Sequence, residues 1–103
     1  MNVIIRGSLL KQLRNIYGYS ADDMCKKLEI SRSYLSAIEN NAKTGKQPSV
    51  DLLKKYADVF GIKLSSLMLL SEQYPDNKSK AEDFIRELMI KLINSLGTEV
   101  MKA

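Results

Sequence analysis

The sequence predicts an all-α fold in which five short helices form one domain and a longer amphipathic helix follows near the C-terminus. Three observations support this prediction. Apolar residues recur every three or four positions in each of six windows, as they do on one face of a helix. Most windows begin after a serine that can cap a helix, and several end at a glycine. No window shows the alternation of apolar and polar residues that is typical of a strand.

The first helix is expected over residues 6–17. Its apolar side carries Leu10, Leu13 and either Ile16 or Tyr17. Gly18 should end this helix, because glycine tolerates the positive φ that follows many helices.

Residues 20–40, SADDMCKKLEISRSYLSAIEN, contain two short helical patterns joined by a turn. Ser20 and Ser31 are good N-caps, because a serine hydroxyl accepts a hydrogen bond from a free amide of the first turn. The apolar positions have helical spacing, and they are Met24 and Leu28, Leu35 and Ile38, with Ile30 in the turn. This arrangement predicts a helix-turn-helix, a unit whose second helix is held so that its first turns can enter the major groove of DNA.

A polar loop is expected at residues 41–48, NAKTGKQP, and Ser49 should cap the fourth helix. That helix should end at Gly61, and its core-facing stripe is Leu52, Leu53, Tyr56, Ala57 and Phe60. The fifth helix is expected from about Leu64 to Glu72. These five helices form the first predicted domain, residues 1–73.

A linker is expected at residues 74–80, YPDNKSK, where a proline and polar residues mark a boundary. The C-terminal helix should follow at residues 81–103, opened by the capping box of Ser79 and Glu82 and ending near Gly97. Its broad apolar side consists of Phe84, Ile85, Leu88, Met89, Leu92, Ile93 and Leu96, with Ile90 off it. A stripe this wide is buried either against the five-helix body or against the same helix of a second chain. We favour a homodimer formed through residues 81–97.

The composition argues against an enzyme or a metalloprotein. The 103 residues include one cysteine and no histidine, which excludes the usual zinc sites and any disulfide within the chain. No glycine-rich phosphate loop or nucleophile–base set occurs, so we expect no catalysis and no cofactor. Cys25 stands where the second helix crosses the third, which favours a buried, inert thiol over a redox sensor. The apolar segments match neither a secretory signal nor a membrane span, and we expect a reducing cytoplasm.

Positive charge is concentrated in the first part of the chain. The net charge is +4; residues 1–47 hold eight basic against four acidic side chains, whereas residues 48–103 hold eight of each. The excess therefore lies with the helix-turn-helix, as expected of a surface that meets DNA phosphates. A solvated surface with an accidental bias explains the charge alone equally well.

Residues 10–67 resemble the lambda-repressor-like helix-turn-helix family, also called the Xre or Cro family. The resemblance lies in the order and spacing of LKQLR at 10–14, GYS at 18–20, MCKKLEIS at 24–31, YLSAIEN at 34–40, PS at 48–49 and LLKKYADVFGI at 52–62. It implies a five-helix DNA-binding domain. It also implies an ion pair between Arg14 and Glu39, which holds the recognition helix at a fixed angle even where its net energy is small.

The chain departs from the family pattern at several places. Ala21 stands where a glutamine commonly grips phosphate or braces the recognition helix, so part of the affinity for the DNA backbone must come from elsewhere. Glu29 stands where glycine is common, and a left-handed conformation there costs roughly 1 kcal/mol. The loop at residues 41–48 is longer than in typical members, and it either follows the DNA backbone or is a surface loop.

The candidate DNA contacts lie in the third helix and in the loop after it. A helix that enters the groove by its N-terminal end presents its early residues to base edges, and here these are Arg32, Ser33, Ser36 and Ala37. Arg32 can bond O6 and N7 of a guanine together, and a phosphate contact is its alternative role. The serines fit a solvated helix surface nearly as well. The candidate phosphate contacts are Tyr34, Asn40, Lys43 and Lys46.

From these features we expect a transcriptional regulator, a repressor, that binds a palindromic operator of double-stranded DNA as a homodimer. Two alternatives use the same fold. The first is an antitoxin-type autoregulator whose C-terminal helix binds a toxin protein. The second is a helical interaction module without DNA readout, which Ala21 favours slightly. Neither a membrane contact nor a small-molecule effector is expected.

Overall fold

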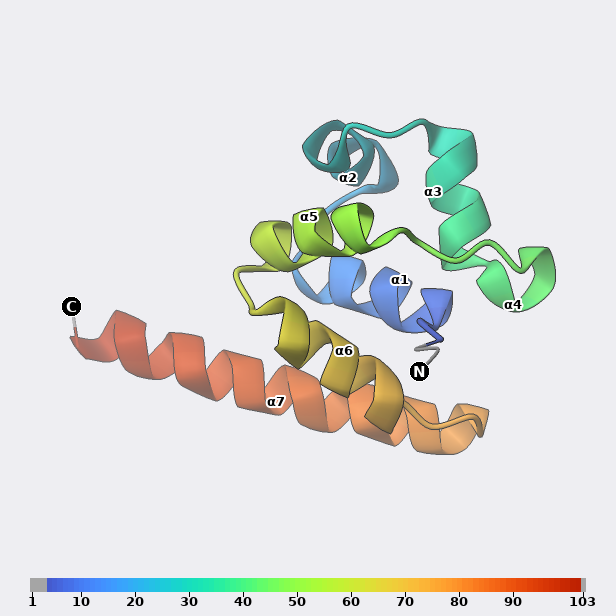
Figure 1. The fold of residues 1–103 in the computed structure, drawn as a ribbon. Coiled ribbons are helices and arrows are strands. Elements are labelled where there is room, and N and C mark those ends of the chain that lie inside the picture. The colour runs from blue at the N-terminus through green and yellow to red at the C-terminus, as the bar shows by residue number, and fades with distance from the viewer. Residues whose placement is uncertain (1–3, 103) are drawn as a thin grey trace. The chain divides into compact units, whose positions relative to one another are not determined.

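The structure, a computed structural model, describes residues 4–102; beyond Lys91, the side chain of Asn94 alone is described. This range contains seven helices and no strand (Figure 1). They are α1 (Gly7–Ile16), α2 (Ala21–Leu28), α3 (Arg32–Glu39), α4 (Asn41–Thr44), α5 (Val50–Phe60), α6 (Leu64–Gln73) and α7 (Lys78–Lys102). The predicted all-α fold with a C-terminal helix is confirmed. None of the helices in residues 4–102 is both long and apolar enough to cross a membrane.

The chain forms two compact units, residues 1–73 and residues 74–103. Helices α1 to α6 make up the first unit, and α7 makes up most of the second. Apolar side chains from α1, α2, α3, α5 and α6 form the core of the first unit, among them Leu10, Leu13, Met24, Leu28, Leu35, Ile38, Leu53, Tyr56 and Leu67. Burial of each of these side chains contributes roughly 1.5–3 kcal/mol to folding before the entropy of the chain is counted.

Three serines begin helices of the first unit, as the sequence predicts. The hydroxyl of Ser20 accepts a hydrogen bond from the amide of Asp23 at 3.0 Å, and Ser31 accepts one from Tyr34 at 3.1 Å. Ser49 caps α5 in the same way, through the amide of Leu52 at 3.1 Å. Each hydroxyl satisfies a first-turn amide that has no partner within its own helix, which fixes where α2, α3 and α5 start.

The segment predicted as a polar loop at residues 41–48 begins with one helical turn, α4, so the first unit has six helices instead of five. Hydrogen bonds to distant backbone stabilise this turn. Asn41 accepts from the amide of Gly7 at 2.9 Å and donates to the carbonyl of Ile5 at 2.7 Å, while Thr44 donates to the carbonyl of Ala37 at 2.7 Å. These contacts are tertiary, and local sequence periodicity does not encode them.

Helix α7 differs from its prediction at both ends. It begins at Lys78, because the carboxamide oxygen of Asn77 accepts from the amides of Ser79 at 2.9 Å and Lys80 at 3.3 Å. Asn77 therefore caps the helix and not Ser79, and the connection after α6 is shorter than the predicted linker. The helical backbone also continues through Gly97, which a long helix tolerates at a cost of about 1 kcal/mol. The predicted stripe residues Leu92, Ile93 and Leu96 have side chains outside the described residues.

Candidate nucleic-acid interface

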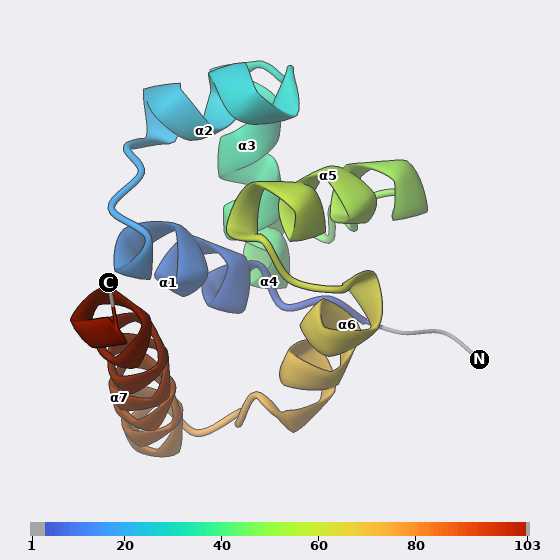
Figure 2. The same ribbon diagram turned by 90° about the vertical axis from the view of Figure 1, so that its left-hand side faces the viewer.

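Helix α3 stands at an edge of the first unit, with α2 near its N-terminal end and α4 at its C-terminal end (Figures 1 and 2). The turn between α2 and α3 depends on Glu29, which is left-handed at φ 60° and ψ 46°. The amide of Ile30 then bonds back to the carbonyl of Cys25 at 3.0 Å. Lys55 of α5 donates to the carbonyl of Leu28 at 3.3 Å, which ties the turn to the core. The left-handed conformation predicted at Glu29 is confirmed.

A buried ion pair holds the C-terminal end of α3 against α1. Arg14 Nε lies 2.8 Å from Glu39 Oε2 and Arg14 Nη2 lies 3.2 Å from Glu39 Oε1, with the two side chains 10% and 6% exposed. Arg14 Nη1 also donates to the carbonyl of Tyr19 at 3.0 Å. The hydrogen bond to Glu39 raises the pKa of Arg14 above its usual value, although burial alone would lower it. This pair has the bidentate geometry that fixes the angle of a helix.

An exposed ion pair lies at the other end of α3. Arg32 Nη1 donates to Asp22 Oδ1 of α2 at 2.9 Å, with side chains 61% and 75% exposed. The sequence analysis treats Asp22 only as a residue suited to the start of a helix and does not pair it with Arg32. Their separation of ten residues crosses the turn, so no helical spacing indicates the contact.

The candidate base-reading residues lie together along the outer side of α3. Arg32, Ser33 and Ser36 are exposed and Ala37 is half-buried, while the intervening Leu35 is buried. The exposed positions follow the helical period, so they form one continuous edge. We call Arg32, Ser33, Ser36 and Ala37 the recognition edge.

The candidate phosphate contacts lie beside this edge. Asn40 is exposed, and its side-chain amide donates to the carbonyl of Ser36 at 2.9 Å, so part of its hydrogen-bonding capacity is used within α3. Lys46 Nζ lies 5.4 Å from the ring centroid of Tyr34, a cation–π distance that brings the loop after α4 back to the first turn of α3. Lys43 is exposed on α4. The fold thus collects all four residues around α3, although they span two elements and a loop.

Cys25 lies in the core and not on this surface. The residue is 8% exposed, and burial raises the pKa of its thiol. The buried position that the sequence predicts is confirmed. A thiol with a raised pKa carries little thiolate, so it is a poor nucleophile and a poor redox sensor.

A family model and the curated relatives of this chain both point to helix-turn-helix proteins. A family model described as helix-turn-helix matches residues 10–67. The HTH-type transcriptional regulator SinR of Bacillus subtilis (strain 168) is 36% identical over 62 residues, which are 60% of this chain and 54% of SinR. SinR of Bacillus licheniformis matches to the same extent. The chain therefore spans about half the length of these curated relatives.

Solved structures of SinR are similar in fold. A crystal structure of SinR, described as the master regulator for biofilm formation, in complex with DNA has a TM-score of 0.52 at 35% identity, covering 60% of this chain and 95% of that one. A structure of the SinR–SinI protein complex has a TM-score of 0.56 at 28% identity, covering 93% of this chain and 95% of that one. Since the family model covers residues 10–67, more than half of the chain, this protein belongs to the lambda-repressor-like (Xre) helix-turn-helix family.

Proposed function

We propose that this chain is a sequence-specific DNA-binding regulator of transcription, a repressor, and that α3 enters the major groove of a palindromic operator. The recognition edge carries the proposal. Arg32, Ser33 and Ser36 are exposed on the outside of α3, while Leu35 and Ile38 on its inside are 1% and 0% exposed. One side of the helix is therefore available to base edges, and the other side fixes it to the domain.

In this proposal Arg32 reads a guanine. Its ion pair with Asp22 is exposed to solvent, and such pairs contribute about 0–1 kcal/mol. A bidentate contact with guanine O6 and N7 discriminates by about 1–3 kcal/mol. Arg32 therefore exchanges the Asp22 carboxylate for a guanine when DNA binds, and Ser33 and Ala37 contact the neighbouring bases. The short hydroxyl of Ser36 is able to meet either a base edge or a phosphate.

The phosphate contacts would come from the residues beside the edge. Lys46 is already held over the ring of Tyr34, and Lys43 lies on α4, next to the end of α3. Ordered cations lose less side-chain entropy on binding than free ones, which favours their use on the DNA backbone. The SinR structure in complex with DNA supports this role for the same domain, since it covers 60% of this chain.

We also propose that the chain acts as a homodimer through residues 81–97 of α7. A two-fold dimer presents two copies of α3 to two half-sites, which matches a palindromic operator. In the alternative, the apolar side of α7 binds a different protein instead of a second copy of this chain. The SinR–SinI complex favours that alternative, because its likeness covers 93% of this chain and so includes part of α7.

Selection of bound fragments from random duplex DNA tests the DNA-binding proposal. We expect one enriched palindromic motif and an affinity that falls steeply with salt, by about 0.9 logarithmic units per phosphate contact for each decade of salt concentration. Enrichment of no motif at low salt would contradict the proposal. Recovery of a single half-site would contradict the palindrome while leaving the role of α3 intact.

Two neighbouring residues of α7 test the dimer. Met89 belongs to the predicted apolar stripe and is 39% exposed, whereas Ile90 lies off the stripe and is 53% exposed. We expect Met89→Glu to convert a dimer to a monomer in light scattering, and Ile90→Glu, with the same change of charge, to remain dimeric. A monomeric wild-type chain would instead favour a partner protein as the occupant of α7.

A further inference from the structure

We propose that Lys11 of α1 binds a phosphodiester group of the DNA backbone, in a hollow that the small side chain of Ala21 leaves open. This inference rests on the proposed DNA-binding function and adds a site to it. It also identifies a source for the backbone affinity that Ala21 cannot supply.

The hollow lies where α1, α2 and α3 meet and has a volume of about 190 Å³. Lys11 lines it from α1, Ala21 from the start of α2, the polar residues Arg32 and Ser36 from α3, and Asn40 from the position directly after α3. Three of these five residues belong to the recognition edge or to the phosphate contacts beside it. A DNA backbone that flanks the groove at α3 therefore passes this hollow.

The charge in the hollow is positive. Glu39 is the acidic residue of its lining, and both carboxylate oxygens of Glu39 accept hydrogen bonds from Arg14. Lys11 is exposed, and no carboxylate of the described residues forms an ion pair with it. The ammonium group of Lys11 is thus a cation available to an anion from outside the chain.

The position of Lys11 is set by the buried ion pair. Lys11 precedes Arg14 by three residues, which places both on the same face of α1. Because Arg14 is anchored on Glu39 of α3, this face of α1 is turned towards α3. The hydroxyl of Ser36 lines the hollow from α3, with Asn40 Nδ2 3.5 Å from its oxygen, which leaves the hydroxyl proton to donate. An ammonium from α1 and a hydroxyl donor from α3 fit the two unesterified oxygens of a phosphodiester.

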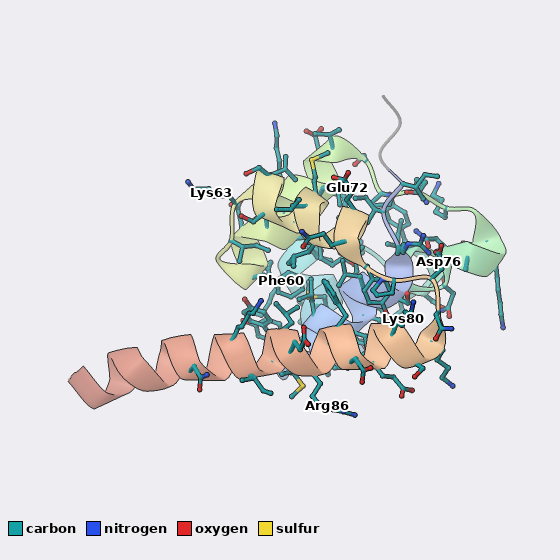
Figure 3. All side chains as sticks on the ribbon, turned by 90° about the horizontal axis from the view of Figure 1, so that it is seen from below. Phe60, Lys63, Glu72, Asp76, Lys80 and Arg86 are labelled. Carbon is teal, nitrogen blue, oxygen red and sulfur yellow. The ribbon has the colours of Figure 1, made fainter. Side chains whose placement is uncertain are left out.

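The test compares Lys11→Ala with Lys63→Ala at several salt concentrations, on the selected duplex and on a scrambled one. Lys63 is an exposed residue at the turn between α5 and α6, on the side of the first unit away from α4 (Figure 3). Each variant removes one positive charge, so the comparison isolates the position of the lysine. We expect Lys11→Ala to weaken binding to both duplexes about eightfold at 0.1 M salt and to lower the salt slope by about 0.9. Lys63→Ala should change the slope by less than half of that amount.

A second variant tests whether the phosphate binds in the hollow itself. Ala21→Gln places a carboxamide donor in the hollow, and we expect it to restore most of the affinity that Lys11→Ala loses. The salt slope should stay low in the double variant, because a neutral glutamine releases no counterion. Thermal unfolding of each variant by circular dichroism controls for folding, and an exposed lysine should change the midpoint little.

Each other outcome overturns the inference in a distinguishable way. Equal slopes for Lys11→Ala and Lys63→Ala would show that the hollow holds no phosphate, while the proposed function would stand. A change in base preference at an unchanged slope would show that Lys11 acts on the recognition edge and not on the backbone. Failure of the wild-type chain to select any duplex would remove the proposed function itself.

Discussion

Two arginine–carboxylate pairs join α3 to its neighbours, one at each end of the helix, and they differ in burial. The Arg14–Glu39 pair at the C-terminal end has side chains 10% and 6% exposed, whereas the Arg32–Asp22 pair at the N-terminal end has side chains 61% and 75% exposed. A buried charge that loses its partner is left without solvation, but an exposed one is solvated by water. An arginine–carboxylate pair therefore fixes α3 at its buried end, whereas at the exposed end the guanidinium of Arg32 can leave its carboxylate for another partner.

The largest expected effect is at the buried pair. Arg14→Ala should lower the free energy of unfolding by about 3–5 kcal/mol, because it leaves the Glu39 carboxylate buried and unpaired. Urea unfolding followed by circular dichroism measures this loss. Arg32→Ala is the matched control and should change stability by less than about 0.5 kcal/mol, since the Asp22 carboxylate stays solvated. Equal losses in the two variants would break the comparison.

Replacing both partners of the buried pair tests whether the loss of stability comes from the unpaired charge. The double variant Arg14→Met, Glu39→Leu should lose less stability than Arg14→Ala alone, because no unpaired charge remains. If the double variant loses as much as the single one, the pair acts mainly through packing. In that case burial of charge does not explain the difference between the two ends of α3.

The next effect concerns DNA recognition at the exposed end. Arg32→Ala should reduce discrimination at one base pair of the selected site by about 1–3 kcal/mol, while binding to a scrambled duplex changes much less. Competition binding with duplexes that vary at each position measures this preference. Uniform weakening on every duplex would make Arg32 a phosphate contact and would contradict the assignment to guanine.

Local features of the chain predict most of the first unit. The serine caps and the apolar stripes depend on residues within a few positions of each other, and the structure has both. The left-handed Glu29 is expected from the resemblance to a family, in which glycine is common at that position. The Arg14–Glu39 contact joins residues 25 apart, and only the resemblance to a family points to it. Sequence spacing alone gives no reason to pair them.

The features that the sequence does not predict depend mostly on contacts between residues far apart in the chain. Helix α4 depends on Asn41, whose hydrogen bonds to Ile5 and Gly7 cross more than thirty residues. The pairing of Asp22 with Arg32 crosses a turn, and the hollow beside Ala21 requires three helices to be in place. The cap of α7 is a different case, because Asn77 is as good an N-cap as Ser79 and a local signal was present.

A smaller effect is expected at the turn that leads into the exposed end of α3. Glu29→Gly should be about 1 kcal/mol more stable than Glu29→Ala, because at a φ of 60° the Cβ of alanine clashes with the backbone and glycine has no Cβ. Both variants lose the contact between Glu29 Oε2 and Lys55 Nζ at 3.5 Å, so the difference between them isolates the backbone. Equal stabilities would mean that the left-handed turn carries no strain.

The smallest effect is expected at Asp22 and bears directly on whether the exposed pair is exchangeable. Asp22→Asn should change the free energy of unfolding by less than about 0.5 kcal/mol, because the pair is solvated and Asp23 still provides a negative charge at the start of α2. Affinity for the selected duplex should rise about two- to threefold, since a negative charge near the phosphates is removed and Arg32 no longer leaves a partner. A fall in affinity with a relaxed base preference would mean that Asp22 orients the guanidinium for readout. The exposed pair would then be part of the recognition geometry, and burial alone would not separate the structural end of α3 from its functional end.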